Sequence, residues 1–135
     1  MRHFIATALL GLAFITIPLS AHHAFAAEFD VNRPLKLRGT VVKMDWINPH
    51  SWIHLDVTGP DGKVVTWMIE GGSPNSLLRL GFGKDALPKG SEIVMEGFQA
   101  KDGSNRGVGK SLSFADGRKL FLGGSAPGAN GDSTK

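Results

Sequence analysis

Short β-type segments separated by glycine turns, with one helix signal among them, are the feature that most constrains the fold of this chain. Ser51–Val57 alternates apolar and polar residues with a period of two, which is typical of a half-buried strand. An Asp-Gly turn signal at Asp61 and Gly62 joins it to a further strand at Lys63–Glu70. The chain contains no cysteine, so packing must hold these strands together without disulfides or thiolate-bound metal.

A long bent strand is predicted ahead of these two, over Leu35–Trp46. Its apolar phase shifts by one residue near Gly39 and the pair Val41-Val42, which indicates a β-bulge. Further strands are predicted at 91–99 and 108–115, and a last hairpin follows the Asp-Gly turn at 116–117.

A helix of about two turns is predicted between the third and fourth strands. Ser73 is a good N-cap, Pro74 suits the first helical position, and Gly81 suits the position just past the end. The resulting element order predicts a mostly β domain, a small five- to six-stranded OB-like barrel with one short helix. A β-sandwich with one helical turn is the alternative.

The N-terminus has the three-part pattern of a secretory signal peptide. A basic start precedes the apolar run Phe4–Leu19, and small residues follow at Ser20 and Ala21. A membrane anchor is the alternative, but it needs about 20 apolar residues. Cleavage after Ala21 is preferred to cleavage after Ala26, because the second site would leave a long polar stretch beyond the apolar run.

These patterns divide the 135 residues into four parts and predict a periplasmic location. The predicted parts are a signal peptide at 1–21, a lead-in segment at 22–34, the OB-like domain at 35–122 and a disordered tail at 123–135. The formal net charge is +3 and no run of like charge occurs. We therefore expect neither a nucleic-acid partner nor, after signal cleavage, a membrane-bound face.

The stretch "INPHSWIHLDV" places two histidines on what is otherwise an ordinary strand. His50, Trp52, His54 and Asp56 share the face opposite the apolar one. On a regular strand the Cα atoms of His50 and His54 lie about 13 Å apart, too far for both to bind one ion. His50 follows Pro49 at a corner, so strand geometry does not fix its direction. The alternative is a solvated strand face on which neither histidine binds a ligand.

The motif "HHAF" offers a second group of nitrogen ligands. After cleavage behind Ala21, His22 carries a free amine and an imidazole, which together chelate Cu(II). The candidate metal ligands are therefore His22, His23 and His50, with copper as the candidate cofactor. A disordered N-terminus without a ligand is the alternative.

Two further residues, Trp52 and Glu70, are candidate ligand-binding side chains. Glu70 begins the stretch "EGGSPN", in which glycines precede a helix N-terminus that could hold an anion. A simple glycine turn into a capped helix is the alternative, since no lysine follows in P-loop spacing. The sequence shows no nucleophile elbow and no HExxH, and we predict no catalytic residue.

Several segments together resemble a family of small exported bacterial proteins that is catalogued as a domain of unknown function. They are "AHHAFAAEFD", "GTVVKMDWINPHSWIHLDV", "WMIEGGSPNSLLRLGF" and "LSFADGRKLF", and they span roughly Ala21 to Leu122. The family usually has His-His-Ser-Phe-Ala, whereas this chain has Ala24 in place of the serine. The family pattern maps onto His22, His23, Phe25, Asn48, Pro49, His50, Trp52, Glu70, Gly71, Gly72, Pro74 and Asn75. The resemblance implies an exported location and a small β-barrel-like domain, and it brings no established activity.

The sequence therefore predicts a periplasmic binding module for a metal ion or another small ligand. The alternative is a non-catalytic interaction or accessory domain for a periplasmic protein partner. An enzyme is less well supported, because nothing in the sequence brings Asp45, Asp56 or Glu70 together as a pair of catalytic carboxylates.

Overall fold

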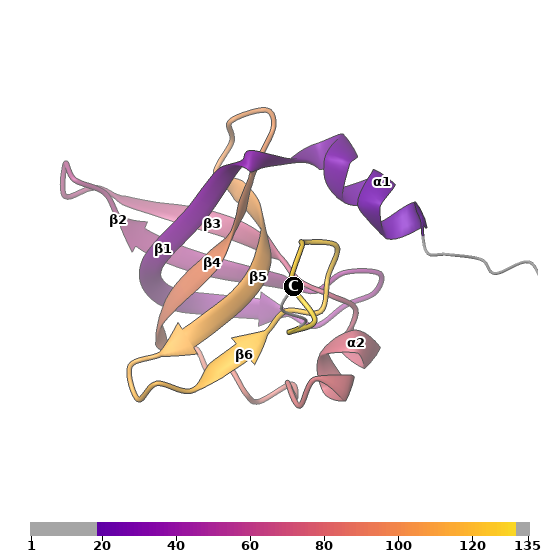
Figure 1. Cartoon of the computed structure of the whole chain (residues 1–135). Helices are drawn as coiled ribbons and strands as arrows, with labels where there is room; N and C mark the ends of the chain where they lie inside the picture. The colour runs from indigo at the N-terminus through magenta and orange to yellow at the C-terminus, as the bar shows by residue number, and fades with distance from the viewer. Residues whose placement is uncertain (1–18, 132–135) are drawn as a thin grey trace, which may run out of the picture.

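A computed structural model describes residues 19–131 of this chain, and the side chains of residues 24–131. Most of the predicted signal peptide, residues 1–18, and the end of the predicted tail, residues 132–135, lie outside the described part. The described chain is mostly β, as predicted (Figure 1). Its elements are α1 (Leu19–Glu28), β1 (Phe29–Asp45), β2 (Trp52–Thr58), β3 (Val64–Glu70), α2 (Pro74–Arg79), β4 (Glu92–Ala100), β5 (Arg106–Phe114) and β6 (Lys119–Phe121).

The strands form one sheet that closes on itself. Their order is β3-β2-β1-β4-β5-β6, and a further parallel pairing joins β3 to β5, so that β1, β2, β3, β5 and β4 complete a ring. The other pairings are antiparallel. The order of elements along the chain, with α2 between β3 and β4, is the one predicted for an OB-like domain. A sandwich of two separate sheets is excluded, because the hydrogen-bonded ladder is continuous.

The predicted bulge in the first strand is confirmed. The pairing of β1 with β2 shifts between Val41 and Lys43. Gly39 leaves no room for a side chain against β2, since a Cβ on this residue would lie 2.3 Å from the backbone oxygen of Asp56. A residue without a side chain is therefore required at the bend.

Residues 22–34, predicted as a lead-in segment ahead of the first strand, contain regular structure. α1 occupies their first part, and β1 begins at Phe29 rather than at Leu35. The reason is a long-range pairing, because Phe29 lies opposite Ala100 and Pro34 opposite Phe98 on β4. Nothing in the local pattern of residues 29–34 indicates this partner.

The main core fills the ring, and α2 lies at one end of it (Figure 1). Ser51, Ile53 and Leu55 are fully buried, which confirms the predicted inward face of β2. The oxygen of Ser73 accepts a hydrogen bond from the amide of Ser76 at 3.2 Å, as expected of the helix cap. The fully buried large side chains are Phe82, Ile53, Leu55, Ile69, Leu77, Met95, Leu112, Leu122, Val41 and Val108.

A second buried cluster joins the two ends of the described chain. Phe25 of α1 packs on Phe29 and meets Phe98 edge-on, with ring centroids 5.5 Å apart. Ala126 and Ala129 of the C-terminal segment are buried in the same cluster. The predicted disordered tail thus differs from the structure over residues 123–131, where turns place these two alanines in this buried cluster. Within residues 19–131, no helix has the length and apolar character needed to span a membrane.

Candidate functional site

The imidazole of His50 is paired with a buried carboxylate. Its Nδ1 lies 2.8 Å from Oε1 of Glu70, the last residue of β3. The side chain of Glu70 is 7% exposed, whereas that of His50 is 44% exposed. The imidazole of His50 is therefore accessible to solvent, and its Nδ1 contacts a buried acidic group.

Backbone contacts fix both partners of this pair. The amide of Ser51 donates to the carbonyl of Gly72 at 3.0 Å, and the amide of Gly71 donates to the carbonyl of Ser51 at 2.8 Å. Gly72 lies so close to the segment after β6 that a Cβ would lie 2.5 Å from the oxygen of Gly123. Gly72 thus lets three chain segments meet at this point, whereas a Cβ on Gly71 would make only ordinary contacts, the nearest at 3.5 Å.

The local electrostatics disfavour ionisation of Glu70. Burial raises the pKa of this carboxyl above its usual value, and the charge of Glu28 raises it further. His50 and Arg106 act in the opposite direction, and burial outweighs them. A cation that reached this carboxylate would therefore relieve an electrostatic cost that the fold carries.

Trp52 and Arg106 extend the site along the same face of the ring. Trp52 lies opposite Glu70 in the pairing of β2 with β3, and the guanidinium of Arg106 lies 5.6 Å from the centre of the indole ring. Arg106 also forms an ion pair with Glu28, the last residue of α1, at 3.0 Å. We call these five residues the Glu70 cluster: Glu28, His50, Trp52, Glu70 and Arg106.

The comparisons with known proteins place the chain in a family. A model of a family of unknown function, DUF6152, matches residues 10–110. The chain belongs to this family. No curated protein and no solved structure matches it.

The segment that matches DUF6152 contains the whole Glu70 cluster and ends before β6. Trp52, Glu70 and His50 were predicted as site residues, and the structure brings them together. Glu28 and Arg106 were not predicted. The parallel pairing of β3 with β5 brings Arg106 to the cluster, and the docking of α1 brings Glu28. Neither contact is indicated by the local sequence.

The predicted metal ligands His22 and His23 lie on α1, and their side chains are outside the described part. Among the described residues, no group of three histidine, aspartate or glutamate side chains is arranged to hold a metal ion. At the cluster of this DUF6152 protein, His50 contacts Glu70, whereas Glu28 is paired with Arg106.

His54, the other histidine of the stretch, is engaged elsewhere. Its Nε2 lies 2.8 Å from Oδ2 of Asp45 on β1, and its side chain is only 15% exposed. The hydrogen bond from His54 is the main cause that holds the pKa of Asp45 below its usual value, with a smaller contribution from Lys43. This geometry ties β1 to β2 and leaves His54 outside the Glu70 cluster.

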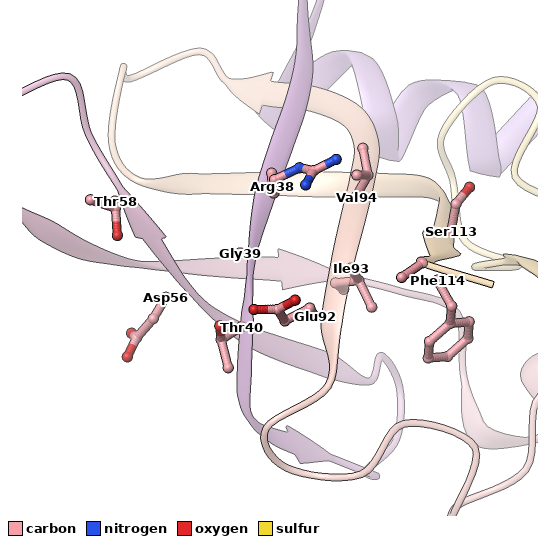
Figure 2. A pocket seen from close by; sticks show the side chains of 11 residues that line it. Arg38, Gly39, Thr40, Asp56, Thr58, Glu92, Ile93, Val94, Ser113 and Phe114 are labelled. Atoms are coloured by element: carbon pink, nitrogen blue, oxygen red, sulfur yellow. The ribbon is translucent and has the colours of Figure 1, made fainter. Parts of the chain in front are cut away.

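A surface hollow of about 520 Å³ lies elsewhere on the ring, and no residue of the Glu70 cluster lines it. Strands β1, β2, β4 and β5 all contribute to it, including Arg38, Asp56 and Glu92. Figure 2 shows the side chains of Arg38, Glu92 and Ser113 spread along the strands rather than converging on one point. The hollow therefore lacks the convergent polar groups expected of a small-ligand site.

Proposed function

We propose that this chain is a small exported binding module and that the Glu70 cluster is its ligand site. The first candidate ligand is Cu(II) or a similar borderline metal ion, bound by His50 together with His22 and His23. One observation carries the proposal: the 2.8 Å contact between Nδ1 of His50 and the buried carboxylate of Glu70.

The contact matters because histidines that bind metal ions commonly donate their other ring N–H to a carboxylate. When Nδ1–H donates to Glu70, the lone pair is left on Nε2. The side chain of His50 is partly exposed, so this nitrogen is open to a ligand. The negative charge of Glu70 also makes the imidazole a stronger donor toward a cation.

The remaining nitrogen ligands would come from α1. The ion pair between Glu28 and Arg106 holds the end of α1 at the cluster, and His22 precedes Glu28 by six residues, or about 9 Å along a helix. A set of imidazole and amine nitrogens suits Cu(II) better than calcium or magnesium, which prefer oxygen ligands.

Cleavage after Ala21 is part of the proposal, because it creates the amine of His22. The burial of Phe25 supports this site. Cleavage after Ala26 would remove a phenyl ring that packs against Phe29 and Phe98. N-terminal sequencing of the exported protein tests this step, and a mature chain beginning at Ala27 would rule out the copper site.

Titration of the mature protein with Cu(II), followed by electron paramagnetic resonance, tests the site itself. We expect one tight site per chain that His50→Ala weakens by at least about 10-fold. His54→Ala is the matched control and should leave the affinity unchanged, because that imidazole is bonded to Asp45. Glu70→Gln should weaken binding less than His50→Ala, since the amide oxygen still accepts the hydrogen bond but lacks the charge. Equal affinity in the wild type and His50→Ala would end the proposal.

An accessory domain for a periplasmic protein partner is the second candidate function. The exposure of two large apolar side chains favours it: Ile47 in the loop before β2 is 53% exposed and Leu78 on α2 is 55% exposed. Native mass spectrometry of the protein isolated from the periplasm discriminates between the two. A metal ion at one per chain supports the first candidate. A stoichiometric protein partner that is lost in Ile47→Ser or Leu78→Ser supports the second.

A further inference from the structure

Half of β3 has a free edge. β2 pairs with the whole of Val64–Glu70, whereas β5 pairs only with its end, at Met68–Glu70. The strand pairings of the described chain give Val64–Trp67 no neighbour on that side. Figure 1 shows the hairpin of β2 and β3 extending beyond the body of the ring, which leaves this edge accessible.

The direction of the backbone groups follows from three hydrogen bonds. The amide of Met68 donates to Asn105, toward β5, whereas the carbonyl of Lys63 and the amide of Gly71 bond toward the β2 side. Because these directions alternate along a strand, the N–H and C=O groups of Val64 and Thr66 point to the free edge. An edge of this kind is a template for another strand unless charge or proline blocks it.

The side chains on this edge do little to block it. Val64 is 60% exposed and Val65 is 37% exposed, and the segment Val64–Trp67 carries no charge and no proline. Lys63 is the charged residue next to it. β-branched residues such as these favour strand pairing.

We propose that this edge pairs with the same edge of a second copy of the chain, antiparallel and about a two-fold axis at Val65. In this arrangement Val64 lies opposite Thr66 of the second copy, and both have their backbone groups pointing at each other. Lys63 lies opposite Trp67 of the second copy, which places a cation beside an indole ring. No like charges lie opposite each other in this arrangement.

The neighbouring arrangements are less suitable. If the axis lay at Thr66, Val64 would lie opposite Met68 of the second copy. The amide of Met68 already donates a hydrogen bond to the carbonyl of Asn105. A shift of the axis toward Val64 would bring in Gly62, which has a φ of +78° in the turn. The axis at Val65 is the arrangement that uses only free backbone groups of regular strand.

Single cysteines test the pairing directly, because the natural chain has none. Across the proposed axis the two Val65 Cα atoms would lie about 4.5 Å apart, within the range of a disulfide. We expect Val65→Cys to form a disulfide-linked dimer at least about 10-fold faster than Val64→Cys and Leu78→Cys. These two controls are more exposed than Val65, so random collision would favour them instead. Equal rates of dimer formation, or faster formation by Val64→Cys, would overturn the proposal. The mass of the disulfide-linked product identifies both chains in it.

A second variant tests the backbone bonds without a crosslink. Val64→Pro removes an N–H that faces the edge and leaves the bonds to β2 in place, at the first position of the strand, where proline is tolerated. Sedimentation should show that the wild type self-associates and that Val64→Pro does so at least about 10-fold more weakly, since the two-fold axis removes two bonds at once. Circular dichroism confirms that the variant is folded. A wild type that stays monomeric at high concentration, or equal association of both proteins, would overturn the proposal.

Discussion

Glu70 is a carboxylate in a position where burial favours its neutral form. Its pKa is raised chiefly because the charged form loses hydration, and the imidazole of His50 only partly offsets this loss. At the scale of the residue, the fold therefore buries an acid next to a histidine, and this burial has an electrostatic cost. A purely structural role at this position would be served as well by glutamine.

The pH dependence of stability tests this account of Glu70. Because its pKa is raised in the folded state, its favourable contribution is fully present below the unfolded value of 4.5 and is lost as the pH rises through the folded value. In metal-free protein, Glu70→Gln and the wild type should therefore be equally stable below that range, and the variant should be the more stable one at neutral pH. Urea unfolding of both proteins across the pH range measures the difference. A difference that does not change with pH would contradict the role of burial.

At the scale of the element, β1 depends on one residue without a side chain. Gly39→Ala would bring a Cβ within 2.3 Å of the backbone oxygen of Asp56 and within 2.9 Å of the side chain of Leu55. We expect this substitution to cost about 2 kcal/mol or more, because the contact is with the backbone of a paired strand. Gly83→Ala is the matched control, since nothing lies within 4 Å of its Cβ position, and it should change stability by less than about 0.5 kcal/mol.

One aromatic side chain of α1 is buried against the strands. Phe25 is 7% exposed and contacts the rings of Phe29 and Phe98. In the mature protein, Phe25→Ala should lower the free energy of unfolding by about 3 kcal/mol, whereas Ala27→Ser, at an exposed position, should change it little. Thermal melts of both variants measure this. Identical melts for Phe25→Ala and the wild type would mean that α1 does not dock.

At the scale of the whole molecule, the second cluster couples the two ends of the described chain. Removal of the residues after Gly124 would take Ala126 and Ala129 out of contact with this cluster. We expect this truncation and Phe25→Ala to be non-additive, because each disrupts the same buried cluster. A double-mutant cycle by urea unfolding checks the coupling, and strictly additive losses would show that the two segments pack independently.

The sequence patterns were most informative where structure is determined locally. The alternation of Ser51–Val57, the cap at Ser73 and the phase shift near Val41 each depend on near neighbours, and each was confirmed. The contacts of Arg106 and the burial of Ala126 depend on segments far apart in the chain. Small residues in a glycine-rich tail and a lone arginine after a turn carry no local signal of such partners. Three of the five residues of the Glu70 cluster could therefore be predicted, and the other two could not.

The closed ring has a consequence for the order in which the chain can fold. The first half of β1 finds its partner on β4, where Leu35 lies opposite Gly97, and β3 meets β5 only once Arg106 to Val108 have been made. Pairings between such distant segments fold slowly, because a long loop must close before any contact compensates for the lost entropy. A nascent chain that ends before β5 lacks the strand that closes the ring. The ring therefore cannot close until at least residue 108 of the 135 has been synthesised.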